Sequence, residues 1–441
     1  MDEFEELTIG RSLKVQSVDE ALGVAMEVTL EAGHTIVEGA RPSSEILDLQ
    51  IQLDNPRDRL LSNPKRKLGL VSSIARFAWM MGGNERLKDI QTYQPKVAAY
   101  SDDKLTVPGS NYGKRLIAPR PGLNQIEGVI GRLSGSDGQV SSGPGSRRAA
   151  GVIWQPDDAV RTSKDIPCAF GVMYAVREGK LIAKTVMRSN NGVTLLPVNL
   201  FEFGLLAEVI AAEAKVELGP LRHDVFSFHI YENERGGAEK ALSGWREIER
   251  AERRPMPPMP VDGPLAQTRL LAKLEAELRH DQNRLRKEGP AELLARSKDL
   301  DPYWTGFYRV LLVHAVCQID RFNAAEAVVK ELPDYFQTEM SEHVDSLREK
   351  HGTSASGQLF DHSEVELAEG KTDHEADPIE NLRALCEEIQ KEFDMPISMS
   401  EYVALEQKLV TGVEARRSAD FLLKKEDVAR ELENIRSAEN N

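Results

Sequence analysis

The stretch "DIPCAFGVMYAVREGKLIAKTVMRSNNG" (Asp165–Gly192) decides the fold of the N-terminal half of the chain. It contains two apolar runs of strand-forming residues, "CAFGVMYAV" and "KLIAKTVMR", and the short "REG" between them predicts a β-hairpin. Cys168 stands at the start of the first run, and Arg188 ends the second. Two interpretations of Cys168 are open. It is either a nucleophile with a phosphate-binding arginine nearby, or a small apolar residue at the edge of a core.

The residues after this hairpin predict a helix and then another strand. "PVNLFEFGLLAEVIAAEAKVELGP" (Pro197–Pro220) is a strongly helical run, with Gly219-Pro220 as its expected stop. "DVFSFHIYENE" (Asp224–Glu234) alternates as a strand does, so His229 and Tyr231 are expected on one face. Strands and helices therefore alternate irregularly here, which favours a mixed α/β domain.

The sequence changes character near Met259, in the proline-rich "ERRPMPPMPVDGP" (Glu252–Pro264), because proline lacks the amide proton that regular structure needs. After it the chain is predicted to be helical, with Pro333 ending a helix and with His314 and Cys317 in an apolar, core-facing stripe. Four regions are expected: a mixed domain over 1–260, a helical extension over 261–351, an acidic linker over 352–377 and a helical segment over 378–441.

Composition and charge argue against several classes of protein. The 441 residues carry a formal net charge of −15, which disfavours broad binding to a nucleic-acid backbone. No apolar run reaches the roughly 18 residues of a membrane span, and the acidic "MDEFEELTIG" does not resemble a signal peptide. We therefore expect a cytoplasmic protein. Its three cysteines are widely separated, so reduced thiols are expected and no metal site.

Short motifs between Arg147 and Tyr231 follow an order that resembles thymidylate synthases and their pyrimidine hydroxymethylase relatives. In chain order they are Arg147-Arg148, Pro167-Cys168, Gly179-Lys180-Leu181, Arg188-Ser189, Leu196-Pro197-Val198-Asn199 and His229-Ile230-Tyr231. "NYGKR" (Asn111–Arg115) resembles the family's Tyr-Gly-Lys stretch, and "FAWMMGG" (Phe77–Gly83) its early tryptophan helix. The shared order and near-gapless spacing make the resemblance specific, and it covers roughly residues 20 to 260.

This resemblance implies a fold, an assembly and a reaction. The implied fold class is α/β (α+β), a thymidylate-synthase-like mixed sheet with surrounding helices, here followed by an all-helical C-terminal region. The implied assembly is a homodimer whose sheets pack back to back. In the implied reaction the cysteine thiolate adds to C6 of a pyrimidine nucleotide monophosphate, and C5 then attacks a one-carbon unit from 5,10-methylenetetrahydrofolate. No metal is expected to take part.

The resemblance also implies a nucleophile and a phosphate site. Cys168 is the candidate nucleophile, and Arg188 is expected to lower its pKa because a cation favours the thiolate. Forked guanidinium groups suit a phosphate, and Arg147 and Arg148 are expected to reach it from the other subunit. The expected phosphate-binding residues are Arg41, Arg147, Arg148, Arg188 and Ser189.

Base and sugar are assigned to other residues by the same resemblance. Asn199 offers a donor and an acceptor to the pyrimidine edge, and it favours uracil because cytosine-specific members of the family carry an acid there. His229 and Tyr231 are expected to bind the sugar hydroxyl. Tyr112 is expected to lie near C5, as a third candidate catalytic residue beside Cys168 and Arg188.

Three altered positions depart from the family. Arg76 stands where the family has a glutamate that organises water and proton transfer at the pyrimidine. Ala169 replaces a histidine after the cysteine, and Asn191 replaces an aspartate that contacts the folate ring. The stretch expected near the folate offers one aromatic residue, Tyr100, and the C-terminal segment that closes over the folate is missing. These losses affect the folate side and proton transfer, whereas the nucleotide side is kept.

Two classes of function follow. The first is a transferase that modifies C5 of a uridine nucleotide, dUMP or UMP, by methyl or hydroxymethyl transfer, with either methylenetetrahydrofolate or an altered one-carbon donor. The second is a nucleotide sensor or assembly protein, in which the old pocket binds a pyrimidine nucleotide. In that case the C-terminal helices bind a partner protein.

Overall fold

The computed structural model describes residues 9–37, 41–248 and 255–356, with isolated residues between 386 and 435. The chain divides into two units, Met1–Gln358 and Leu359–Asn441. Apart from those isolated residues, the helical segment predicted over 378–441 lies outside the described residues. So does the predicted linker beyond residue 356. The boundaries between the four predicted regions stay predictions.

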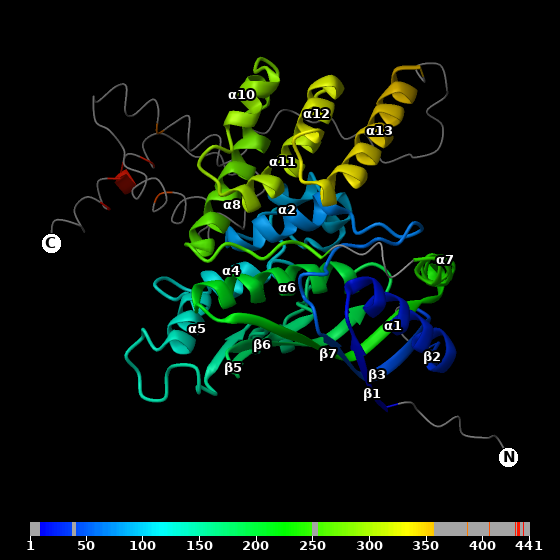
Figure 1. Ribbon diagram of the computed structural model, residues 1–441, viewed down its shortest axis with the longest axis vertical. Helices are drawn as coiled ribbons and strands as arrows, with labels where there is room; N and C mark the ends of the chain where they lie inside the picture. Colours follow the sequence, from blue (N-terminus) through cyan, green and yellow to red (C-terminus); the bar gives the residue numbers. More distant parts are fainter. Residues whose placement is uncertain are drawn as a thin grey trace. The chain divides into compact units, whose positions relative to one another are not determined.

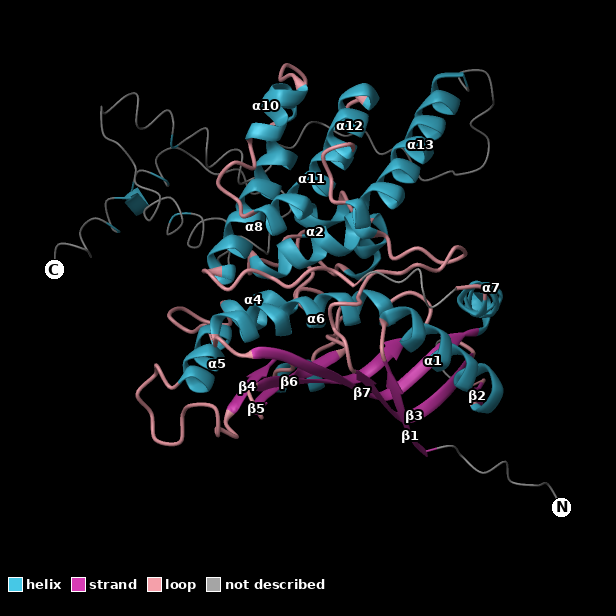
Figure 2. Cartoon of the chain, viewed as in Figure 1, coloured by secondary structure: helices cyan, strands magenta, loops and turns pink. Residues whose placement is uncertain are grey.

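A mixed sheet organises the first unit (Figure 2). Its strand order is β1-β3-β7-β6-β5-β4, with β2 paired to the edge of β3, so seven strands are described. The pairs β1–β3 and β6–β7 are parallel, and the others are antiparallel. The strands are β1 (Ile9–Val15), β2 (His34–Ile36), β3 (Ser43–Leu53), β4 (Ala149–Val152), β5 (Ala169–Arg177), β6 (Lys180–Asn191) and β7 (Glu217–Tyr231). This arrangement confirms the predicted mixed sheet.

The β5–β6 hairpin confirms the prediction made from the Cys168 stretch. The two strands are antiparallel, and Arg177 pairs with Lys180 next to the turn. The turn residues Glu178 and Gly179 both have positive φ, 52° and 74°. A two-residue turn of that kind matches the twist of the strands, and glycine takes it without a steric penalty. Cys168 is the residue directly before β5, which begins at Ala169.

The central helix α6 (Leu196–Glu213) is buried on nearly all sides, which is why its sequence is apolar all round. The prediction that it stops at Gly219-Pro220 is wrong. The helix ends at Glu213, Lys215 takes a positive φ of 56°, and β7 begins at Glu217. Gly219 and Pro220 instead lie where the register between β6 and β7 shifts. A bulge accepts a residue that has no amide proton to give to the ladder.

Helices cover one face of the sheet (Figure 2). Ser17 caps the first of them, because its side chain accepts a hydrogen bond from the amide of Glu20. These helices are α1 (Val18–Ala32), α4 (Tyr112–Ile117), α5 (Gln125–Ser134) and α6, and α7 (Arg235–Arg246) packs on α1. Apolar side chains of β4, β5 and β7 are exposed, namely Val152, Phe170, Met173 and Phe226.

The helical extension packs on α2 (Leu70–Met81), the helix that carries Arg76 (Figure 1). Phe77 of α2 stacks on Trp304 of the extension, with ring centroids 6.3 Å apart. The extension contains α8 (Pro264–His280), α9 (Gln282–Leu285), α10 (Pro290–Ala295), α11 (Pro302–Cys317), α12 (Phe322–Val329) and α13 (Asp334–Ser356). The predicted helical character is therefore confirmed over this range, and Pro333 separates α12 from α13 as expected.

Two smaller findings complete the described fold. His314 and Cys317 are buried, as the apolar stripe of α11 predicts. The described helices do not include one with the length and apolarity that a membrane crossing requires. Short elements remain to be named: α3 (Leu87–Gln91) and the 3-10 turns η1 (Pro95–Tyr100), η2 (Pro156–Ala159) and η3 (Glu232–Glu234).

Candidate functional site

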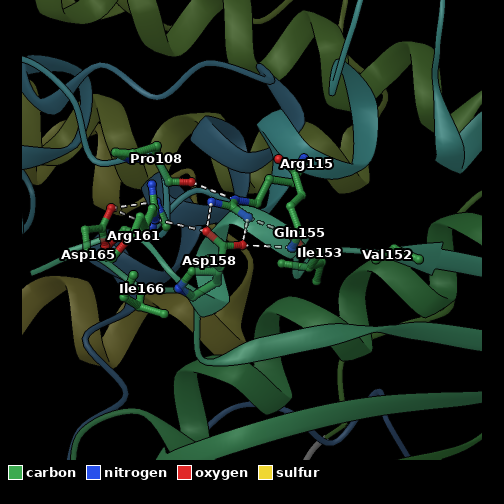
Figure 3. Close-up of polar contacts among 12 residues, drawn as sticks. Pro108, Arg115, Val152, Ile153, Gln155, Asp158, Arg161, Asp165 and Ile166 are labelled. Carbon is green, nitrogen blue, oxygen red and sulfur yellow. Dashed lines mark hydrogen bonds and ion pairs between the residues drawn. The ribbon is translucent and has the colours of Figure 1, made fainter. Parts of the chain in front are cut away.

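A network of polar contacts holds the loop that leads to Cys168 (Figure 3). The Asp165 carboxylate accepts hydrogen bonds from the amides of Gly109 and Ser110, at 2.6 and 3.0 Å, and from the Ser110 hydroxyl at 2.6 Å. Arg161 donates from Nη2 to the Asp165 carbonyl at 2.6 Å. Both the side chain and the backbone carbonyl of Asp165, three residues before Cys168, are therefore held by hydrogen bonds.

A buried ion pair also holds this loop against helix α4. Arg115, at the end of α4, pairs with Asp158, and it donates from Nε to the Pro108 carbonyl at 2.8 Å. Asp158 also faces Arg161 Nε at 3.1 Å. The arginines hold the pKa of the Asp158 carboxyl below its ordinary value, although burial opposes them. The carboxylate consequently stays charged and links α4 to the loop.

The Cys168 thiol lies beside the side chain of Arg188. Nη2 of Arg188 is 3.9 Å from Sγ, and it also donates to the carbonyl of Ile166 at 3.0 Å. Nε of Arg188 donates to the carbonyl of Pro167 at 2.8 Å, so the guanidinium is oriented by the same loop that carries the cysteine. Burial raises the pKa of the Cys168 thiol, while Arg188 and Arg76 act to lower it. Arg188 thus has the expected direction of effect, but burial outweighs it.

A buried ion pair between helices α2 and α6 lies close to the Cys168 loop. Arg76 donates from Nε to Glu202 at 3.2 Å and from Nη2 to the Ser110 carbonyl at 2.9 Å. Its guanidinium also lies over the ring of Tyr112, 5.6 Å from the centroid. Burial raises the pKa of the Tyr112 hydroxyl, and the neighbouring Cys168 adds to that effect. Cys168, Tyr112, Arg76 and Glu202 therefore belong to one electrostatic cluster.

The candidate sugar-binding residues lie on the sheet, at the end of β7. His229 and Tyr231 have ring centroids 4.6 Å apart on β7, and His229 Nδ1 is 3.5 Å from the Ser189 hydroxyl on β6. Arg41 lies over the Tyr231 ring at 5.1 Å, so a residue assigned from a single arginine match joins this group. Burial lowers the pKa of His229, which keeps the ring neutral near physiological pH.

The candidate base-reading residue, Asn199, is 2% exposed in the first turn of α6. Its Oδ1 accepts a hydrogen bond from Asn190 Nδ2 at 2.7 Å. The Asn190 side chain is itself buried, and its Oδ1 has no hydrogen-bond partner in the described part of the chain. This bond uses one of the two lone pairs of the Asn199 carbonyl oxygen, and the amide nitrogen of Asn199 is a further donor.

Two altered positions, Asn191 at the end of β6 and Ala169 at the start of β5, have side chains that are engaged or buried inside the protein. Asn191 Oδ1 accepts from the Thr194 amide and hydroxyl at 2.7 and 2.9 Å, and Nδ2 donates to Glu234 at 2.5 Å. Ala169 is fully buried and pairs with Met187 of β6. With both functions of the Asn191 amide engaged inside the protein, these residues do not fit a folate ring bound in the family's way.

The predicted phosphate residues Arg147 and Arg148 are not joined to the rest of the site. Both are exposed just before β4. Arg148 donates weakly to the Val140 carbonyl at 3.5 Å. Across residues 9–37, 41–248 and 255–356, neither arginine forms a hydrogen bond or an ion pair with another predicted site residue. The same ranges hold no cluster of three or more His, Cys, Asp or Glu side chains suited to a metal ion.

Sequence reasoning missed three residues of this site: Asp165, Trp154 and Glu202. Trp154 lies under the Arg188 guanidinium at 5.8 Å, and nothing in its local sequence marks it. Glu202 did carry a signal, because a carboxylate inside an otherwise apolar helix requires a buried partner.

Comparisons with known proteins give matches over about half of the chain. A family profile described as thymidylate synthase matches residues 43–266, just over half of the chain. A "Putative thymidylate synthase" of Methanosarcina acetivorans is 25% identical over 245 residues, 55% of this chain and 98% of that protein. A deoxyuridylate hydroxymethyltransferase of Delftia phage PhiW-14 is 27% identical over 202 residues, 43% of this chain and 53% of that enzyme. Among solved structures, thermostable thymidylate synthase A from Bacillus subtilis aligns with a TM-score of 0.44 and 18% identity, over 51% of this chain and 83% of that one.

Proposed function

This chain belongs to the thymidylate synthase family, and on that premise we propose that it transfers a one-carbon group to C5 of a uridine nucleotide, dUMP or UMP. The observation that carries the proposal is the pairing of a half-buried thiol, Cys168, with Arg188 at 3.9 Å. A thiol in that position has a cation to stabilise its thiolate form. The Delftia phage relative named as a deoxyuridylate hydroxymethyltransferase supports the uridine substrate class.

The proposed reaction uses the thiolate as a temporary nucleophile. Cys168 Sγ bonds to C6 while the C5=C6 electron pair moves toward C5 and O4. C5 then bonds to the electrophilic carbon of the one-carbon unit, whose π electron pair moves to its heteroatom, and the C5 proton passes to water. The Sγ–C6 bond breaks as the C5=C6 double bond returns. Arg188 stays beside the sulfur throughout and favours the thiolate over the thiol.

Binding of the nucleotide is assigned to residues already near one another. His229 and Tyr231 bind the sugar hydroxyl, and Asn199 donates to O4 of uracil through its amide nitrogen. Arg41, Arg188 and Ser189 bind the phosphate. The family normally takes its one-carbon unit from methylenetetrahydrofolate. Since Asn191 is engaged with Thr194 and Glu234, we propose that the donor is held differently here.

We also propose that the chain forms a homodimer. The exposed apolar side chains of Val152, Phe170, Met173 and Phe226 come from three strands of one sheet. Burying such side chains against a second copy is favourable. The same arrangement lets Arg147 and Arg148 reach the phosphate of the partner subunit, which accounts for their exposure here.

The alternative function, nucleotide binding without transfer, is favoured by one observation. Two of the altered positions, Arg76 and Asn191, are tied to protein groups, which leaves fewer groups for a second substrate. In that case the nucleotide acts as a signal, and the C-terminal helices bind a partner protein.

Tritium release from C5-tritiated dUMP and UMP separates these functions. We expect the wild type to release tritium with methylenetetrahydrofolate present, and the Cys168→Ala variant to release none. If the wild type binds nucleotide but releases no tritium with or without that donor, the transferase proposal is wrong and the binding function stands. A wild type that binds neither nucleotide contradicts both.

A further inference from the structure

Glu202 is a buried carboxylate placed beside the candidate base-reading residue. It lies three residues after Asn199 on α6, so the two side chains share a helix face. Its side chain is 1% exposed in the folded protein. The helix around it is apolar, and a carboxylate in such surroundings is costly unless a partner stabilises it.

The partner of Glu202 is Arg76, the residue that stands where the family has a glutamate. The Glu202 carboxylate receives a single hydrogen bond within the described residues, from Arg76 Nε at 3.2 Å. Arg76 in turn lies over Tyr112 and acts electrostatically on Cys168. The cluster around Tyr112 and Cys168 therefore still contains a carboxylate, although it comes from a different helix.

We propose that Glu202 is a catalytic residue that moves a proton at O4 of the bound uracil, with Arg76 as its positioning residue. This inference rests on the proposed function. As Sγ bonds to C6, the C5=C6 pair becomes a C4=C5 bond, and the C4=O4 pair takes the proton from the Glu202 carboxyl. When C5 uses the C4=C5 pair to bond to the one-carbon unit, C4=O4 forms again and the proton returns from O4 to Glu202. Loss of the C5 proton then gives the C4=C5 enol a second time, with O4 protonated by Glu202, and the proton returns to Glu202 again as Sγ leaves. No electron is gained or lost in any of these steps.

The surroundings of Glu202 suit a group that exchanges a proton. Burial raises the pKa of its carboxyl, and the Arg76 guanidinium opposes that rise. The charged and titratable groups of this cluster are Arg76 on α2, Tyr112 on α4, and Asp165 and Cys168 on the loop before β5. A general acid is most effective when its pKa approaches the working pH, so a raised value favours this role.

A double variant tests the proposal without leaving a buried charge alone. Glu202→Gln by itself strands the Arg76 charge, whereas Arg76→Gln with Glu202→Gln removes both charges and keeps two hydrogen-bonding side chains. We expect this double variant to bind dUMP within about threefold of the wild type but to release tritium from C5 at least about 100-fold more slowly, the usual effect of a general acid.

A second double variant returns the carboxylate to the family's position. Arg76→Glu with Glu202→Gln is expected to recover at least about tenfold of the lost rate, because a carboxylate again faces the pyrimidine. A merely structural role does not predict this recovery. Glu208→Gln, on the same helix but outside the site, serves as the matched control and is expected to keep the wild-type rate wherever it is folded.

The outcomes distinguish this inference from the proposed function. If the wild type releases no tritium, the proposed function is wrong and this inference falls with it. If the wild type is active and the Arg76→Gln, Glu202→Gln variant keeps a rate within about threefold, Glu202 is not catalytic while the proposed function stands. Loss of dUMP binding in that variant, with an unchanged unfolding transition, assigns Glu202 to binding and also overturns the proposal.

Discussion

Two glutamates of the same helix, Glu202 and Glu208, are both buried against arginine, yet their surroundings differ. Glu208 is 2% exposed and pairs with Arg59 and with Arg57, whose Nε is 2.6 Å away, and it also accepts from the Met259 amide at 3.0 Å. Glu202 receives one hydrogen bond in the described structure, from Arg76.

This difference sets the pKa of each carboxyl in opposite directions. Three sets of donors outweigh burial at Glu208 and hold its pKa below the ordinary value. One arginine does not outweigh burial at Glu202, so its pKa is raised. A carboxylate with several donors stays charged at neutral pH and serves the fold, whereas one with a single partner changes its protonation state more readily. The number of donors, rather than burial, separates Glu208 from Glu202, the residue proposed to be catalytic.

The largest expected effect is on folding stability, at Glu208. Glu208→Gln leaves the Arg59 guanidinium charged, fully buried and without a counter-charge. We expect a loss of about 3–5 kcal/mol in the free energy of unfolding, measured by urea denaturation. A loss below about 1 kcal/mol contradicts the view that Glu208 is a structural anchor.

A smaller loss of stability is expected at Glu202. In Glu202→Gln the Arg76 guanidinium keeps its bond to the Ser110 carbonyl and its contact with the Tyr112 ring. We expect a loss of about 1–3 kcal/mol in the same denaturation experiment. If this variant is less stable than Glu208→Gln, the two roles have been assigned the wrong way round.

The pH dependence of these two losses is expected to have opposite signs. Glu208 has a lowered folded pKa, so its contribution is present above pH 4.5, the ordinary value, and is lost as the pH falls through the folded pKa. Glu202 has a raised folded pKa, so its contribution is present below pH 4.5 and is lost as the pH rises through the folded pKa.

Unfolding free energies measured from about pH 3 to pH 7 check this sign. The penalty of Glu208→Gln is expected to shrink toward low pH, and the penalty of Glu202→Gln to shrink toward high pH. Parallel curves for the two variants would show that both carboxyls have the same kind of environment.

The smallest expected effect is on the reactivity of the Cys168 thiol. Arg76 acts to lower its pKa, so Arg76→Gln with Glu202→Gln is expected to slow alkylation by iodoacetamide about two- to fivefold near pH 8. Cys317 provides an internal reference, because burial raises its pKa to about 12. Glu208→Gln is expected to leave the rate at Cys168 unchanged, and an equal slowing in both variants contradicts a local effect of Arg76.

Local patterns were sufficient for the elements that carry the site. The apolar runs around Glu178-Gly179 predicted the hairpin, and the alternation up to Tyr231 predicted the last strand of the sheet. The order of the motifs likewise predicted which family the chain belongs to. The predicted helix stop at Gly219-Pro220 failed because these residues also suit a bulge in a strand, and local sequence does not distinguish the two.

The sequence by itself therefore predicted the hairpin, the last strand of the sheet, the family and the candidate nucleophile Cys168. Only the tertiary structure decided which charged side chains lie near that cysteine. Arg76 and Glu202 are 126 residues apart in the chain, and they form an ion pair because α2 and α6 pack together. Arg76 taken alone indicated a lost carboxylate, whereas the folded chain contains one beside it. Hydrophobic periodicity reports which face of a helix is buried, but the partner of a buried charge depends on how distant elements pack.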